Sequence, residues 1–450
     1  MEILSMHITK HKSALFTAVV AAALALTSCS GSTGPAEAVD INPAGDVVPR
    51  EISWLLSRPA DGGVIKAMEQ IAKEYTADHP GFKLNLITTP DRPSYIQKYE
   101  TLAAANKLPE LFDTDATPFA QKLATQGRMV NVEELLKDLN LTDEYRPAAL
   151  NYQRFDDGSL YMVPFEFQLE TFWYNSSLLK SAGVEVPKTL DDFPQMCTSL
   201  RDKGITPIAL DGQDQWPLER YMAYYPFRMA GPEYVQNLKN GKASFGDPAG
   251  KAAAEWLYKL GQSGCFQEGF SSTGYADAQA LFTSGKAAVY NIGTWELGNL
   301  ATDNLNPAVR DSVDYFTLPT IDGAVTKTNE YVTPSGIGMA VNAKTYDPLV
   351  RDFLAFALAK YPEVYAATGA LSPTNNVQTT IPDNATPLYE RAVKAADEVG
   401  DAIAMPWDTQ LDPATNTRLQ QELTLLVQGN IKPDEFIKTM DASLAENNNG

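Results

Sequence analysis

Residues 51–87 read EISWLLSRPADGGVIKAMEQIAKEYTADHPGFKLNLI. The segment Glu51–Leu56 has the apolar residues of a buried strand, and Lys83–Ile87 has those of a second strand. Between them, Val64–Tyr75 carries apolar residues at the spacing of three and four that is typical of an amphipathic helix. Two strands joined through a helix pair in parallel, because a parallel connection needs a long crossover. This stretch therefore predicts an α/β fold with a parallel sheet.

The same alternation of short strands and helices continues along the chain. Further helices are expected at 95–105, 119–125, 176–182, 190–203, 249–261, 350–360, 385–399 and 417–428, and further strands at 110–112 and 207–210. No segment repeats with a fixed period of about 20 to 50 residues, which excludes a solenoid or a propeller. Two α/β lobes are the natural packing, and the long extended stretch Tyr161–Asn175 is placed to pass from one lobe to the other.

The composition excludes several classes of function. The chain has 450 residues, with 36 Lys and Arg against 56 Asp and Glu, and a formal charge of −20. Because so acidic a chain repels phosphates, we predict no nucleic-acid partner. Three His and three Cys leave little material for a metal site, and the sequence has no phosphate-binding loop, dinucleotide fingerprint or zinc-protease motif. We therefore predict no metal and no cofactor.

The N-terminus has the features of an export signal. Basic residues at 10–12 precede an apolar run at 14–26, which is shorter than the about 20 residues that span a bilayer. The sequence Leu26-Thr27-Ser28-Cys29 resembles the bacterial lipobox, in which the Cys is acylated. We predict a lipoprotein signal peptide at 1–28, lipidation of Cys29 and a flexible tether at 29–47, rich in small and polar residues. The alternative is a plain secretory signal followed by an incidental Cys.

Export would leave Cys197 and Cys265 in an oxidising compartment. A disulfide between them would close a long loop and contribute roughly 4 kcal/mol in the chain-entropy model. Two buried free thiols are the alternative, and the sequence leaves both open.

Three tryptophans stand beside Gly, Pro or Asp in segments that we expect to be loops: Trp216, Trp295 and Trp407. A core tryptophan more often lies inside a periodic helix, as Trp256 does. Sugars have apolar C–H faces and hydroxyl edges, so a sugar site needs flat aromatic platforms beside fixed carboxylates and amides. The three tryptophans are therefore predicted platforms for a sugar, with ordinary packing as the alternative.

Candidates for catalysis are weak. His79 lies at a helix end before Pro80, where it is a poor general base for a nucleophile. The acidic segments 113–115 and 211–214 lack the ligand count of a calcium loop and are read as turn carboxylates. We predict a binder rather than an enzyme; the alternatives are a secreted glycoside hydrolase or lyase that uses cleft carboxylates, and a lipoprotein adhesin.

A series of short motifs runs in order along the chain. They are the segments 51–75, 108–112, 127–132, 157–164, 172–175, 282–289, 293–295 and 334–338, followed by Gly429 before a closing helix. From about Glu51 to Leu444 the chain thereby resembles the carbohydrate-type extracellular solute-binding proteins of bacterial ABC importers, the group that includes maltodextrin-binding protein.

The resemblance implies a two-lobed periplasmic-binding-protein-like fold with three inter-lobe crossings and a ligand cleft at the hinge. Lobe 1 would comprise 48–165 and 334–368, and lobe 2 would comprise 166–330 and 374–450. A monomer held at the extracytoplasmic face of the cell membrane by its lipid anchor would capture an oligosaccharide and deliver it to the transmembrane permease subunits.

The resemblance also implies which residues bind the sugar. They are the aromatic residues Trp295, Trp216 and Trp407, the polar residues Asp113, Asp115, Asp214, Glu166, Gln168 and Arg58, and Gly336 where the backbone approaches the ligand. Maltodextrin binders often have an aromatic residue where this chain has Asp113-Thr114-Asp115. A shorter or differently linked oligosaccharide is therefore as well supported as a maltodextrin.

Overall fold

The computed structural model describes residues 39–58, 62–89, 91–332, 335–400 and 403–447. The predicted signal peptide, Cys29 and the tether as far as residue 38 lie outside the described residues. None of the helices in the described ranges combines the length and the apolar character needed to cross a bilayer.

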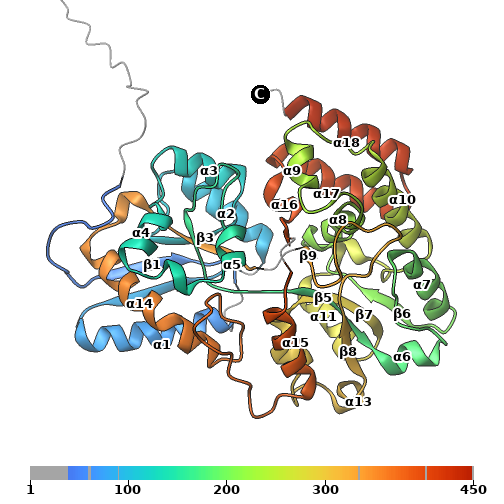
Figure 1. Cartoon of the computed structure of the whole chain (residues 1–450), viewed down its shortest axis with the longest axis horizontal. Helices are drawn as coiled ribbons and strands as arrows, with labels where there is room; N and C mark the ends of the chain where they lie inside the picture. Colours follow the sequence, from blue (N-terminus) through green and yellow to red (C-terminus); the bar gives the residue numbers. More distant parts are fainter. Residues whose placement is uncertain (1–38, 59–61, 90, 333–334, 401–402, 448–450) are drawn as a thin grey trace, which may run out of the picture. The chain divides into compact units, whose positions relative to one another are not determined.

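Strands are interspersed with helices along the chain, and runs of several helices follow β3, β6 and β11 (Figure 1). The strands are β1 (Glu51–Leu55), β2 (Lys83–Ile87), β3 (Leu111–Thr114), β4 (Met162–Pro164), β5 (Glu170–Asn175), β6 (Thr206–Ala209), β7 (Ala287–Gly293), β8 (Val313–Phe316), β9 (Tyr331–Val332), β10 (Gly338–Val341) and β11 (Ile403–Ala404). The α-helices are α1 (Gly63–Asp78), α2 (Arg92–Ala104), α3 (Pro118–Thr125), α4 (Val132–Asp138), α5 (Pro147–Tyr152), α6 (Ser176–Ser181), α7 (Phe193–Arg201), α8 (Trp216–Ala230), α9 (Tyr234–Lys239), α10 (Pro248–Gln262), α11 (Tyr275–Thr283), α12 (Leu297–Leu300), α13 (Pro307–Arg310), α14 (Pro348–Ala366), α15 (Pro387–Asp397), α16 (Trp407–Gln410), α17 (Pro413–Gln428) and α18 (Pro433–Asn447). Short 3₁₀ turns are η1 (Thr142–Glu144), η2 (Leu190–Asp192), η3 (Phe270–Ser272), η4 (Thr294–Glu296) and η5 (Ala343–Thr345).

The first lobe is built on a five-stranded sheet with the order β2-β1-β3-β10-β4. Strands β1, β2 and β3 are parallel, as the opening strand-helix-strand pattern predicts, whereas β10 returns from late in the chain and runs antiparallel to both β3 and β4. Successive residues of β1 point to opposite faces of the sheet. Ile52 and Trp54 pack with helices α1 and α14, and Leu55 packs with Tyr95 and Tyr99 of α2. Both faces are therefore covered by helices, which fits the apolar residues Ile52, Trp54 and Leu55 of β1.

The second lobe is built on a four-stranded sheet with the order β6-β7-β5-β8. Strands β6 and β7 are parallel, and β5 and β7 are antiparallel. Adjacent residues of β5 again enter different cores, because Phe172 packs with α7, α8 and α10 while Trp173 packs with α11 and α12. A further two-stranded pair joins β9 and β11.

The extended stretch Tyr161–Asn175 connects the two sheets, and this prediction is confirmed. Its first part forms β4 beside β10 in the first lobe, and its last part forms β5 beside β7 in the second. The intervening residues 165–169 are the first crossing. The sheets take their strands from the segments assigned to each lobe, while the lobe boundaries themselves remain our prediction.

Three details differ from the sequence prediction. The expected helix at 190–203 divides into η2 and α7, and a capping box between Thr189 and Asp192 begins η2. Helix α17 begins at Pro413 rather than 417, because the Asp412 side chain accepts hydrogen bonds from the first backbone amides. The end of the predicted tether is not free: Ile41 packs on the first lobe, and its carbonyl accepts a hydrogen bond from Tyr346.

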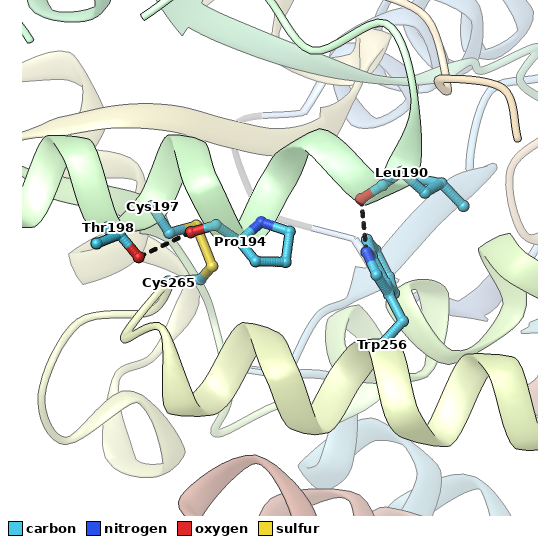
Figure 2. Close-up of a disulfide and its surroundings, with 6 residues drawn as sticks. All are labelled: Leu190, Pro194, Cys197, Thr198, Trp256 and Cys265. Carbon is cyan, nitrogen blue, oxygen red and sulfur yellow. Dashed lines mark hydrogen bonds between the residues drawn. A yellow bond between two sulfur atoms is a disulfide. The ribbon is translucent and has the colours of Figure 1, made fainter.

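Cys197 and Cys265 form a disulfide, which decides between the two alternatives that the sequence left open (Figure 2). It joins α7 to the segment that follows α10, and both cysteines are fully buried in the core of the second lobe. The Nε1 group of Trp256 on α10 also donates a hydrogen bond of 2.6 Å to the carbonyl of Leu190, ahead of α7. The disulfide and this hydrogen bond thus link α7 and α10, together with the residues that flank them, at two separate points.

We predict that the double variant Cys197→Ser/Cys265→Ser loses about 4 kcal/mol of unfolding free energy, because the disulfide closes a loop with a sequence separation of 68. Urea denaturation with and without reductant measures this. Reductant should lower the midpoint of the parent protein and leave that of the double variant unchanged. Equal midpoints for the parent and the double variant would contradict the prediction.

Candidate functional site

One edge of the first sheet collects three of the predicted polar residues. Strands β1, β3 and β4 all end at this edge, because β10 is antiparallel to its neighbours and begins there. Arg58 follows β1, Asp115 follows β3, and Glu166 follows β4. In open α/β sheets, ligands bind outside the carboxyl ends of the strands. The topology thus gathers residues that are far apart in the sequence at the expected place for a ligand.

The second sheet presents a corresponding edge. Strands β6 and β7 end there, and β5 begins there, with Glu170 opposite Gly293. Trp216 follows β6, Trp295 follows β7, and Gln168 precedes β5. The first crossing therefore connects the two edges directly.

The carboxylate of Glu166 is the centre of a polar network along this crossing. It pairs with Arg58 at 3.2 Å, and it accepts hydrogen bonds from the Tyr365 hydroxyl at 3.2 Å and from the Gln168 amide at 3.3 Å. The Gln168 side-chain oxygen accepts a hydrogen bond of 2.8 Å from the hydroxyl of Thr294, which follows β7. The network runs continuously from the loop after β1 to the end of β7.

Gly336 lies against Glu166. A Cβ atom at position 336 would lie 2.7 Å from Oε2 and 2.9 Å from Cβ of Glu166, which is closer than real Cβ atoms come. The Gly336 carbonyl accepts a hydrogen bond of 2.8 Å from the Gln153 amide. Its φ is outside the left-handed region, so this glycine is required for space rather than for backbone freedom. Gly336 therefore leaves space for Glu166, which is one of the predicted site residues.

Gly336→Ala should destabilise the protein by about 1–3 kcal/mol, the usual cost of overpacking, because the new methyl group displaces Glu166. Thermal unfolding of the variant measures the loss. Gly298→Ala is the matched control, since a Cβ atom there meets nothing within 4 Å and Gly298 is inside α12. If both variants unfolded at the parental temperature, the close contact with Glu166 would not matter.

Asp113 has a structural role within the first sheet. Its side chain is fully buried, accepts hydrogen bonds from Trp54 Nε1 at 2.9 Å and from the Ser57 amide at 2.8 Å, and pairs with Arg58. Burial raises the pKa of Asp113 to about 6, although the Arg58 guanidinium opposes this. Asp113 fixes Arg58 in place, and because its side chain is fully buried, it supports the site instead of contacting a ligand directly.

Asp115 belongs to a chain of ion pairs that joins the two lobes. It pairs with Arg92 of α2 at 2.7 Å, and Arg92 also approaches Asp408 of α16 at 3.5 Å. Asp408 pairs with Arg220 of α8 at 2.8 Å, and Arg220 pairs with Glu170 at 3.0 Å. Burial opposes the ionisation of Asp408, but Arg220 and Arg92 together lower its pKa. Positive and negative side chains alternate along this series of ion pairs. Their mutual attraction compensates for the hydration that the charged groups lose on burial.

Trp295 and Trp216 form an aromatic pair at the edge of the second sheet. Their ring centroids are 6.3 Å apart with an angle of 61° between the planes, and Trp295 is 36% exposed. The Trp295 indole nitrogen donates a hydrogen bond of 2.7 Å to the Tyr275 hydroxyl, which in turn donates to Glu296. The indole ring also lies on the backbone of Gly293, where a Cβ atom would come within 1.9 Å of it. These contacts fix the orientation of a partly exposed aromatic surface.

Trp407 is not available as a platform. It is only 2% exposed, its ring stacks on Tyr234 with centroids 6.0 Å apart, and it packs edge-on against Phe245. The next residue, Asp408, is the one that reaches the ion chain. Packing in the core of the second lobe, the alternative that we stated for these tryptophans, holds for Trp407.

The expectation that the three tryptophans lie in loops is also wrong. Trp216 is the first residue of α8, Trp407 is the first residue of α16, and Trp295 lies in η4. Pro217 follows Trp216, and proline favours the first turn of a helix as much as it favours a loop. By contrast, Trp256 is buried inside α10, as its periodic context predicts.

Asp214 forms a close pair with Asp211 after β6. The Asp214 backbone amide donates a hydrogen bond of 3.1 Å to the Asp211 side chain, and Asp211 is 2% exposed. Burial, and secondarily the charge of Asp214, raises the pKa of Asp211 to about 7. Burial also raises the pKa of Asp214. Near neutral pH, this pair therefore retains a proton more readily than two exposed carboxyls would.

Because folding raises the pKa of Asp211, ionising it costs stability as the pH rises from about 4 to about 7. Asp211→Asn keeps the side-chain oxygen that accepts from Asp214 and removes the titration. The variant should gain stability relative to the parent between pH 4.5 and pH 8, measured by urea midpoints. Asp202→Asn, which alters an exposed carboxyl of the same lobe, should show no such trend. A pH-independent difference for Asp211→Asn would refute the assignment.

Several residues of the site were not found from the sequence. They are Arg92, Arg220, Glu170, Tyr275, Glu296 and Asp408. Arg220 had a usable signal, because it lies one helical turn after Trp216 and its guanidinium lies 5.0 Å from the centroid of that ring. Asp408 had none, since its partners come from α2 and α8 and only the tertiary structure brings them together.

The described residues contain no group of three or more His, Cys, Asp or Glu side chains that could hold a metal ion. Two cavities of this part of the chain, one beside Phe266 and Val427 and one beside Arg128 and Lys344, share no lining residue with the network described above.

A comparison with protein-family models identifies the family of this chain. The family described as bacterial extracellular solute-binding protein matches residues 61–360. The chain belongs to this family. As a member of the extracellular solute-binding proteins, it is the extracytoplasmic binding component of an ABC importer, and its family and fold are those of transport proteins.

Relatives and solved structures agree with this membership. The solute-binding protein is 21% identical over 390 residues to an uncharacterized ABC transporter extracellular-binding protein of Pyrococcus horikoshii, covering 86% of this chain and 81% of the relative. It is 22% identical to a multiple sugar-binding protein of Streptococcus mutans, covering 62% of this chain and 64% of that one. A chitin oligosaccharide binding protein shares the fold, with a TM-score of 0.78, 24% identity and coverage of 90% and 100%. A solute-binding protein in complex with raffinose does so with a TM-score of 0.65, 18% identity and coverage of 88% and 99%.

Proposed function

We propose that this solute-binding protein captures an oligosaccharide between the facing edges of its two sheets. The observation that carries the proposal is the pair Trp216 and Trp295, in which the partly exposed Trp295 indole is held in a fixed orientation beside carboxylates. The apolar face of a sugar ring stacks on such a surface, while its hydroxyl groups bond to neighbouring carboxylates and amides. The ligands in the names of the relatives and neighbours, which include chitin oligosaccharide and raffinose, support a sugar.

Glu166, Gln168 and Asp115 are proposed as the hydrogen-bonding partners of the sugar. Glu166 and Gln168 lie on the first crossing, and Asp115 lies at the end of β3. Because Asp115 belongs to the first lobe and Trp295 to the second, with Glu166 and Gln168 on the crossing between them, a ligand that contacts all of them would favour a closed arrangement of the lobes. The closed form is the species that we propose is delivered, as a monomer, to the permease subunits.

Trp295→Ala should weaken binding of the cognate oligosaccharide by at least tenfold, because a stacked aromatic face contributes on the order of 1.5–3 kcal/mol. Titration calorimetry against an oligosaccharide panel identifies the ligand and measures the change. Val325→Ala is the control, since Val325 is an exposed residue that follows β8. Unchanged affinity for Trp295→Ala would remove Trp295 from the site. Release of reducing sugar during long incubation would instead support the hydrolase alternative.

We also propose that the mature protein begins at Cys29 and is held to the membrane by acyl chains on that residue. The lipobox-like segment 26–29 and the small, polar residues that follow it support this proposal. Each buried CH₂ contributes about 0.8 kcal/mol, and one chain binds only marginally, so stable anchoring requires more than one acyl chain.

Cys29→Ser should release the protein from the membrane fraction into the medium or periplasm, because the anchor can no longer form. Detergent phase partitioning and intact-mass measurement follow the change. Ser30→Ala, next to the proposed site, should stay in the detergent phase. A Cys29→Ser protein that still partitioned into detergent would contradict lipidation at this residue.

A further inference from the structure

The carboxylates beside the two tryptophans lack cationic partners. Within the described residues, Asp211, Asp214 and Glu296 form no ion pair. Glu296 accepts only from neutral groups: the Tyr275 hydroxyl and the amides of Gln279 and Asn299. One oxygen of Asp211 is buried without any hydrogen-bond partner. Because burial raises the pKa of Asp211 to about 7, this carboxyl is only partly ionised near neutral pH, and the excess of negative charge on this side of the site lies mainly on Asp214 and Glu296.

The nearby arginines are already neutralised. Each of the three pairs with two carboxylates: Arg58 with Asp113 and Glu166, Arg92 with Asp115 and Asp408, and Arg220 with Glu170 and Asp408. Recognition of a carboxylate or a phosphate normally uses a guanidinium whose fork of N–H groups is free to form two parallel bonds. An acidic sugar would have to compete with these protein carboxylates for the same donors.

The other groups that face Asp211 and Asp214 do not cancel the negative charge on this side of the site. Arg92 faces Asp214 from the first lobe, together with the negatively charged Asp91. The Tyr290 phenol lies near Asp211, Asp214 and Glu296 and is neutral at ordinary pH. Because water is largely excluded from buried groups, a carboxylate on a ligand would be repelled by these side chains more strongly than it would be at an open surface.

We infer that the Trp216–Trp295 region, through Asp214 and Glu296, selects its ligand by charge: it accepts neutral sugars and sugars with a protonated amine, and it rejects sugars with a carboxylate or phosphate. This inference rests on the proposed function and names the chemical class of the ligand. The acidic residues act as specificity determinants, because repulsion excludes wrong ligands as effectively as contacts retain the right one.

The test is a calorimetric panel on the full mature protein. It contains neutral trisaccharides of glucose, galactose, xylose and N-acetylglucosamine, the cationic glucosamine trimer, and the acidic trimers of glucuronate and galacturonate. The best neutral binder is then compared with its own 6-amino and 6-carboxylate derivatives. We expect the carboxylate form to bind at least tenfold more weakly than the neutral form, and the amino form to bind at least as tightly. Added salt should reduce the difference in affinity between the neutral and the carboxylate forms, because it screens the repulsion.

Asp214→Asn examines the cause. Removal of this charge should narrow the ratio between neutral and acidic affinities by at least threefold, whereas Asp202→Asn removes one exposed charge of the same lobe and should leave the ratio unchanged. Tighter binding of a uronate or a sugar phosphate than of any neutral sugar would overturn the inference and leave the proposed function intact. Failure of every sugar to bind would overturn both. A ratio that is unaffected by Asp214→Asn would also count against the inference.

Discussion

The carboxylate of Glu166 links the segments through which the chain passes between its two sheets. It pairs with Arg58 from the loop after β1, accepts from Tyr365 of α14, contacts Gln168 on the same crossing and packs on Gly336 before β10. All these elements meet at the carboxyl edge of the first sheet because β10 returns antiparallel between β3 and β4. A two-lobed binding protein requires a defined geometry where its lobes join, and this ion and hydrogen-bond network supplies it.

Burial of charge is the second constraint on the site. Arg58, Arg92 and Arg220 are buried or partly buried, and each is tolerated because carboxylates surround it. The same arrangement makes the arginines poor receptors for an anionic ligand, whereas Asp214 after β6 and Glu296 after β7 form no ion pair within the described residues. Structure and selectivity thus have one electrostatic origin: the cations stabilise the fold, and the anions that remain face the place proposed for the sugar.

The sequence predicted some residues of the candidate site better than others. The sequence singled out Trp216 and Trp295 because they follow apolar strands and stand beside Gly, Pro or Asp; the structure shows that their rings are neighbours, and their role in sugar binding stays a proposal. The same reasoning failed for Trp407, since a local pattern does not report that Tyr234 and Phe245 cover its ring. It also failed for Asp113, whose partners Trp54, Ser57 and Arg58 are brought to it by sheet pairing.

The sequence by itself determined the α/β class, the parallel strand pairing, the long passage at Tyr161–Asn175 and the membership of a family of extracellular binders, because periodicity and short motifs are local properties. Only the tertiary structure decided that Cys197 and Cys265 pair and that Asp408 connects Arg92 to Arg220. It alone also showed which predicted residues are buried supports and which are exposed. Those outcomes depend on distances between segments that are 68 to 316 residues apart in the sequence, and a local pattern carries no information about such distances.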